Sequence, residues 1–381
     1  MPLPPAARPL ARLAVVWTAL SGLAPVYPLY ALLFLDTGLS AAQVSGLFAL
    51  WSVTGLLAEV PTGVLADRWS RRGSLVLAGV LEAAGFVLWT VAPGLPGFAA
   101  GFVVWGVGGA LVSGAAEAVV YEGLAAAGAE DSFVRVQGAT TATELLVQVP
   151  TALLAGVLVE AGGHALVGWA SVGTCLAAAA LATRFPETAP TDGGDDGGGG
   201  LRSAVTDALR RPSLRLTVVA VALLGGLDAL EEYFPVMARD RGVPTALVPT
   251  AVLVVALAGA AGAALAGRLA RLPSRALPAL LTASAGLLAV GALAGAAVAP
   301  AAVALSYGLY LAVLVVGEAR LQEQVPGAAR ATVTSVAGLG TELASLLVFA
   351  AWALGSAPAV AVLFLAVAPV VALGLRARQT R

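Results

Sequence analysis

Between two apolar runs of the chain lies the stretch Glu59-Val60-Pro61-Thr62-Gly63-Val64-Leu65-Ala66-Asp67-Arg68-Trp69-Ser70-Arg71-Arg72. The run that ends within it, 42–66, and the run that follows it, 73–92, are each close to the length of about 20 residues that an α-helix needs to cross a bilayer. The charged side chains between the two runs therefore form a short loop at a membrane surface.

The composition also favours lipid as the solvent of this protein. Of its 381 residues, 59% are hydrophobic and 11% are charged, and the mean hydropathy is +0.91. Soluble domains are about 45–50% apolar and about 25% charged. The net charge of −1 argues against a nucleic-acid partner, and the single cysteine, Cys175, excludes an intramolecular disulfide.

Twelve apolar stretches follow one another, so we predict an all-α membrane protein with twelve transmembrane helices. The first stretch is too long for the apolar region of a signal peptide, and we expect it to remain as the first span. The predicted spans are 13–35, 42–66, 73–92, 97–121, 135–159, 164–184, 215–238, 245–267, 275–297, 299–320, 330–352 and 357–375.

The distribution of arginine predicts the orientation. Lysine is absent, and if the N-terminus lies inside, 19 of the 21 arginines fall on the cytoplasmic side. Only Arg239 and Arg241 then fall outside, which is the asymmetry of the positive-inside rule. Both termini are therefore expected in the cytoplasm.

The two halves of the chain echo each other around a polar segment rich in glycine and aspartate. Residues 186–213 are predicted to be a cytoplasmic linker between an N-terminal six-helix bundle, 1–185, and a C-terminal six-helix bundle, 214–381. Parallel repeats of this kind occur in alternating-access transporters. The echoes are Gly22-Leu23, Asp36 and Gly38 with Gly226-Leu227, Asp240 and Gly242; Leu65-Ala66, Arg68 and Arg71 with Leu265-Ala266, Arg268 and Arg271; Glu117-Ala118 and Glu122 with Glu318-Ala319 and Glu323; and Thr143-Glu144-Leu145 with Thr341-Glu342-Leu343.

Residues 63–72 resemble the signature loop of the major facilitator superfamily, G-x-L-A-D-R-x-x-R-R, and the lead-in from Glu59 is similar to a bacterial branch of efflux permeases. Segments 113–118 and 330–335 are similar to the same branch. The resemblance implies a monomeric transporter of a bacterial inner membrane, with spans 1, 4, 7 and 10 around a central cavity and spans 3, 6, 9 and 12 outside. Two antiporter motifs are missing, since 102–106 contains no arginine and only Pro150 is left of G-P-x-x-G-G.

The signature loop is a candidate gate. Gly63 would let two helices approach closely, and Asp67 could pair with an arginine or lie at a helix N-terminus, where an anion is favoured. Arg68, Arg71 and Arg72 can also contact anionic lipid headgroups. The alternative is a simple positive-inside anchor, which requires neither Gly63 nor Asp67.

Acidic side chains within the predicted spans are the candidates for binding protons or substrate. Such groups are costly in lipid and usually mark an ion or proton path, although a neutral carboxyl hydrogen-bonded between helices is the alternative. The main candidate is Asp228, which shares a face with Glu231 and Glu232 if the segment is α-helical. The further candidates are Glu144 and Glu342, together with Glu117 and Glu318, which lie nearer the cytoplasm, as does Glu59. Glu82 belongs to a span that the resemblance places outside.

Four tyrosines are candidates for lining the pocket: Tyr27, Tyr30, Tyr307 and Tyr310. Their rings could contact a cation, or they could simply pack in the core or at the interface. The sequence shows no metal-spaced cluster of histidine and cysteine, no phosphate-binding loop and no paired nucleophile and base. We therefore expect neither an enzyme nor a cofactor.

The leading hypothesis is proton-coupled export of a small cationic or amphipathic compound by alternating access. One alternative is an uptake permease or uniporter for a neutral solute such as a sugar, although the spans contain few asparagines and glutamines. A non-transporting membrane receptor or accessory protein is an alternative of another class, since a fold alone does not establish function.

The first testable prediction concerns topology. A single cysteine placed within 186–213, in a Cys175→Ala background, should react with a membrane-impermeant thiol reagent only after the cells are opened, because the arginines place that segment inside. Labelling of this cysteine in intact cells would contradict the orientation.

Overall fold

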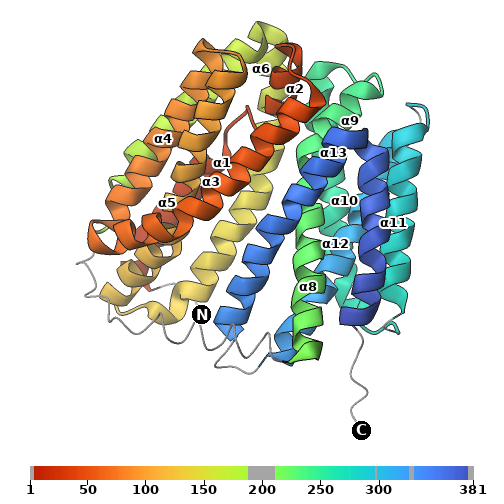
Figure 1. Cartoon of the computed structure of the whole chain (residues 1–381). Coiled ribbons are helices and arrows are strands. Elements are labelled where there is room, and N and C mark those ends of the chain that lie inside the picture. The colour runs from red at the N-terminus through yellow and green to blue at the C-terminus, as the bar shows by residue number, and fades with distance from the viewer. Residues whose placement is uncertain (1–3, 188–210, 274, 297, 326–329, 376–381) are drawn as a thin grey trace. The chain divides into compact units, whose positions relative to one another are not determined.

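The computed structural model describes residues 4–187, 211–273, 275–296, 298–325 and 330–375. All regular elements within those residues are helices (Figure 1). The α-helices are α1 (Arg8–Gly22), α2 (Tyr30–Asp36), α3 (Ala41–Arg68), α4 (Arg71–Val91), α5 (Leu95–Ala126), α6 (Phe133–Ala182), α8 (Pro212–Gly226), α9 (Phe234–Asp240), α10 (Val248–Leu269), α11 (Ala276–Leu293), α12 (Ala299–Gln324) and α13 (Arg330–Gly374). The 3-10 helices are η1 (Pro5–Ala7), η2 (Glu130–Ser132), η3 (Leu227–Tyr233) and η4 (Thr245–Leu247).

The described helices provide the twelve predicted crossings. Eight segments are long and apolar enough to span a membrane by length and composition. Two of them, in α6 and α13, each contain two crossings joined at a sharp bend. The first and seventh crossings are each interrupted: α1 continues into α2, and α8 continues through η3 into α9. Because each piece is short, neither interrupted crossing counts among the eight.

The chain divides into two compact units. Unit 1 comprises Met1–Leu39, Leu50–Gly193 and Thr245–Thr250, and unit 2 comprises Ser40–Ala49, Gly194–Pro244 and Ala251–Arg381, as far as these ranges are described. Two short segments thus depart from the predicted bundles. Most of the predicted linker, 188–210, lies outside the described residues, so the proposed boundaries stay a prediction.

The first crossing of each half of the chain is broken in the same place. The long helices α1 and α8 each have 15 residues and end at a glycine, Gly22 or Gly226. The short helices α2 and α9 each have seven residues and end at an aspartate, Asp36 or Asp240. A glycine with positive φ then turns the chain, with φ of 91° at Gly38 and 81° at Gly242. The structure therefore repeats at the same offset as the sequence.

The bends within α6 and α13 also have one backbone geometry. Gly162 and Gly163 have φ, ψ of −153°, 18° and 64°, −165°, whereas Gly355 and Ser356 have −161°, 19° and 54°, −150°. Two spans can thus follow each other with almost no loop. The second residue of each bend lies in a region of φ and ψ that is accessible essentially to glycine alone, so Ser356 is strained where Gly163 is not.

This difference generates a prediction about stability. Replacing Ser356 by glycine should raise the free energy of unfolding by about 1 kcal/mol or more, because the exposed serine is held in a glycine conformation. The matched change, Gly163→Ser, should lower stability by a similar amount. Thermal unfolding of detergent-purified protein measures both, and unchanged melting temperatures would show that neither bend is strained.

Close helix contacts build the interior of unit 1. Helix α4 packs against α5 and α6, and α1 packs against α6 (Figure 1). A Cβ added at Gly85 of α4 would lie 2.9 Å from the carbonyl oxygen of Gly101 on α5, so only glycine permits this approach. Beside it lies a cluster of aromatic rings formed by Tyr27, Tyr30, Phe34, Trp51, Phe86, Trp89, Phe98, Phe102 and Trp105.

Candidate functional site

Arg71, at the start of α4, joins two acidic side chains of unit 1. Its Nη2 lies 2.9 Å from Oδ1 of Asp67, across the turn between α3 and α4. Its Nη1 pairs with Glu122 on α5. Arg71 is 15% exposed and Glu122 is 24% exposed, whereas Asp67 is 54% exposed. Glu122 is therefore the more shielded partner, and water weakens the pair with Asp67 more strongly.

The remaining polar side chains of the signature loop extend this network. Ser70 caps α4 by accepting a hydrogen bond from the Gly73 amide at 2.7 Å, and its hydroxyl also donates to Glu187 at 2.5 Å. Arg72 pairs with the other oxygen of Glu187 at 2.5 Å. Arg68 ends α3 with an exposed side chain. The loop thus ties together α3, α4, α5 and the chain after α6.

The close helix contact expected at Gly63 requires glycine at Gly114, on the facing helix α5, and not at Gly63 itself. A Cβ added at Gly63 would meet no heavy atom within 4 Å, whereas a Cβ added at Gly114 on α5 would lie 3.2 Å from Cα of Gly63. The two helices do meet at Gly63, but the crowded position belongs to Gly114. Substitution of Gly63 itself is therefore sterically tolerated on this face.

The network predicts which arginine stabilises the fold. Arg71→Leu should lower the free energy of unfolding by about 1.5–3 kcal/mol, because Glu122 loses its cation while largely buried. One oxygen of Glu122 already lacks a hydrogen-bond partner within the described residues. The matched control Arg68→Leu should change stability by under about 0.5 kcal/mol. Equal melting-temperature shifts for the two variants would contradict the assignment.

In unit 2, the main acidic candidate lies where the seventh crossing is broken. Asp228 belongs to η3, and Tyr307 of α12 donates its hydroxyl to Oδ1 of Asp228 at 3.0 Å. Glu231 follows one turn later, and Glu318 lies further along α12; both are close enough to interact electrostatically with Asp228. Within the described part of the chain, no arginine forms an ion pair with any of these three acids.

The geometry of η3 corrects one expectation. An α-helical segment would place Asp228, Glu231 and Glu232 on one face, but residues 227–233 form a 3-10 helix. With three residues per turn, Glu231 eclipses Asp228 while Glu232 points about 120° away. The series of three acids on one face is therefore wrong, and a pair remains.

The four candidate tyrosines fall into two classes. Tyr307 contacts Asp228, and Tyr27 lines a cavity of unit 1. Tyr310 is 1% exposed and donates its hydroxyl to the carbonyl oxygen of Leu224 at 2.7 Å, near the end of α8. Tyr30 is 5% exposed within the aromatic cluster. Tyr30 thus belongs to the core, whereas Tyr310, although buried, also lies close enough to Asp228 to interact with it.

The cavity of unit 1 has a volume of about 360 Å³. Its lining includes Glu144 together with Glu82, Gln148 and Ser21. The superfamily resemblance places the span of Glu82 outside the central cavity, which led us to discount this residue. The structure nevertheless brings Glu82 and Glu144 to one cavity inside the unit.

Two other acidic candidates occupy different positions. Glu117 accepts a hydrogen bond from the side-chain amide of Gln137 at 3.1 Å, which links α5 to α6. Glu342 lies on α13 with an exposed side chain. Neither residue lines the cavity of unit 1. The hydrogen bond between α5 and α6 accounts for the presence of an acidic side chain at Glu117.

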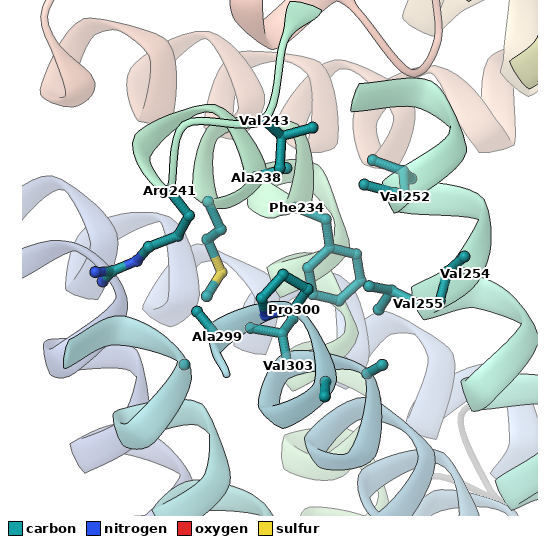
Figure 2. A pocket seen from close by; sticks show the side chains of 15 residues that line it. Phe234, Ala238, Arg241, Val243, Val252, Val254, Val255, Ala299, Pro300 and Val303 are labelled. Carbon is teal, nitrogen blue, oxygen red and sulfur yellow. The ribbon is translucent and has the colours of Figure 1, made fainter. Parts of the chain in front are cut away.

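A second cavity, in unit 2, is almost entirely apolar. It has a volume of about 310 Å³ and is lined by residues of α9 to α12, among them Phe234, Val252, Val255 and Val303 (Figure 2). Arg241 stands at its edge, and its guanidinium donates hydrogen bonds to the carbonyl oxygens of Ala292 and Ala294. Those carbonyls hold the arginine away from the cavity, which leaves a site without charge.

Comparison with protein families shows to which family the chain belongs. The family model described as Major Facilitator Superfamily matches residues 13–349. The chain belongs to the Major Facilitator Superfamily. This Major Facilitator Superfamily protein is thus a multi-pass membrane protein and a secondary transporter of small molecules, and not an enzyme. No curated protein matches its sequence closely enough to name a nearer relative.

Solved structures agree on the fold. A D-xylose-proton symporter matches with a TM-score of 0.71 and 14% identity over 98% of this chain and 99% of that one. The nucleoside transporter NupG matches with a TM-score of 0.72 and 12% identity over 98% of both chains. A bacterial homologue of the human lysosomal transporter Spinster, in an inward-facing and occupied conformation, matches with a TM-score of 0.73 and 14% identity over 98% of this chain and 93% of that one. At such low sequence identities, these matches show a shared fold but do not indicate the substrate.

Sequence reasoning overlooked Glu122 and Gly114, and it discounted Glu82. Glu122 carried a usable signal, since it recurs as Glu323 in the second half. Gly114 lies in a segment already similar to the superfamily branch, next to the candidate Glu117. Glu82 carried the signal of an acidic side chain within a predicted span, but helix order alone does not show which face of the third span borders a cavity.

Proposed function

We propose that this facilitator exports a small organic cation in exchange for protons, and that Asp228 carries the coupling proton. The observation that supports the proposal is the hydrogen bond from Tyr307 to Asp228 at the break between α8 and α9. Broken helices at such a depth are where secondary transporters place their ion and substrate sites.

The surroundings of Asp228 suit a group that gains and loses a proton. The residue is part-buried in the middle of a crossing, and no described arginine compensates its charge. Glu231 lies on the same face and repels a second negative charge. A hydroxyl donor such as Tyr307 can stabilise the ionised carboxylate when the site is hydrated. A dry site without a cation thus favours the neutral carboxyl, whereas a hydrated site with the Tyr307 donor favours the ionised carboxylate.

The charge of the acidic sites favours a cationic substrate. Asp228, Glu231 and Glu318 gather in unit 2, and Glu82 and Glu144 line the cavity of unit 1. None of the described arginines lines that cavity. An anionic substrate would therefore be repelled, whereas a cation would be attracted and could contact tyrosine rings.

The fold accommodates proton coupling and several substrate classes. One structural neighbour is described as a D-xylose-proton symporter and another as a nucleoside transporter. Symport of a neutral solute is therefore the main rival to export of a cation. The gate at Gly63, Asp67 and Arg71 belongs to the same proposal, since contacts made in one of two states shift the population between them.

The test uses inverted membrane vesicles with an acidic interior and phenyltrimethylammonium, a permanent cation that cannot cross lipid as a neutral amine. The wild type should accumulate this cation in proportion to the pH gradient. Asp228→Asn should abolish that accumulation, because an amide has nearly the size of the protonated acid but releases no proton. The matched control Asp240→Asn, an exposed acid on α9, should behave as the wild type.

Three results would contradict the proposal. Wild-type flux and pH dependence in Asp228→Asn would make this carboxyl structural. Absence of gradient-driven accumulation in the wild type, together with accumulation of a neutral sugar by intact cells, would favour the uptake permease. Absence of any substrate-dependent flux in proteoliposomes would favour a receptor.

A further inference from the structure

The cavity inside unit 1 holds polar side chains that have no partner. Around its volume of about 360 Å³ stand Glu82, Glu144, Gln148 and Ser21. Within the part of the chain that the structure describes, the side chains of these four residues make no hydrogen bond or ion pair. Glu144 and Gln148 are exposed and Ser21 and Glu82 are half-buried, so an occupant that enters the cavity can reach all four side chains and pair with them.

The two acids lie at different depths. Glu82, on α4, is half-buried and lies near Tyr27 and Cys175. Glu144, on α6, has an exposed side chain, as has Gln148 one turn further along. The carboxyl of Glu82 is thus the interior acid of the cavity, and Glu144 is the acid nearer to solvent. An occupant that enters past Glu144 meets Glu82 inside.

The lining also defines the chemistry of the occupant. None of the described basic side chains belongs to the lining, whereas Trp17 and Tyr27 contribute aromatic rings. Two carboxyl groups and aromatic surface together favour a positive charge attached to an apolar body. A water cluster could satisfy the polar groups, but it would not use the aromatic wall or select for charge.

We propose that this cavity binds a small protonated organic amine, with Glu82 as its charge partner and Glu144 at its entrance. The proposal rests on the proposed function, because it locates the transported cation in unit 1, apart from the proton site at Asp228 in unit 2. Sites for the cation and the proton are then separate, and each can be tested without the other.

The experiment measures binding by isothermal titration calorimetry to the purified full chain in detergent, without any pH gradient. The probes are 2-phenylethylamine, which is charged at neutral pH, and 2-phenylethanol, its neutral counterpart. In the wild type the amine should bind at least about tenfold more tightly than the alcohol, which is the effect of one charge-assisted hydrogen bond. Equal affinities would overturn the proposal.

Variants then locate the site. Glu82→Gln should weaken amine binding by about tenfold and leave alcohol binding within about twofold, because it removes charge and keeps shape. The matched control Glu160→Gln removes an exposed acid of α6 that is not part of the lining, and it should bind both probes as the wild type does. Unchanged amine affinity in Glu82→Gln would overturn the proposal.

A steric variant covers the case in which Glu82→Gln does not fold. Gly109 belongs to the lining, and a Cβ added there meets no heavy atom within 4 Å. Gly109→Phe should therefore fill the cavity and abolish binding of both probes, and amine binding that survives it would overturn the proposal. Because binding is measured without a pH gradient, loss of amine binding in Glu82→Gln is distinguishable from the loss of gradient-driven accumulation in Asp228→Asn.

Discussion

Hydrocarbon offers no hydrogen-bond partner to a peptide group, and this constraint governs where the chain can depart from a helix. The two broken crossings meet it in different ways. In unit 1, Ser171 accepts a hydrogen bond from the Val26 amide at 3.0 Å, and Thr151 donates one to the Gly22 carbonyl at 3.2 Å. In unit 2, η3 keeps its own hydrogen bonds, and Tyr310 caps the Leu224 carbonyl.

Each break therefore depends on neighbouring helices, and this dependence places polar side chains in the middle of the bundle. Asp228 lies within one break, and Tyr27 lies within the other. Once the backbone has left the α-helix, the groups that satisfy it come from α6 or α12, which also carry Glu144 and Tyr307. The helices that supply hydrogen bonds to the broken backbone therefore also supply side chains to both candidate sites.

The architecture was predictable because it depends on averages over many residues. Apolar runs, arginine placement and the echo of Gly22 and Asp36 in Gly226 and Asp240 sufficed for twelve spans. The sites depend on single dihedral angles and helix faces, which such averages do not contain. Glu232 left the expected face because η3 has three residues per turn, and Glu82 faces a cavity from a span that helix order places outside.

The contact of Gly85 with the Gly101 carbonyl illustrates a property of the whole interior. Glycine and alanine have no side-chain rotamers to lose, so helices that meet through them pack with almost no loss of side-chain conformational entropy. The same surfaces have no side chains that could rearrange to absorb a displacement. Helices joined in this way should move together as stiff bodies, with deformation confined to the few places where the backbone is already irregular.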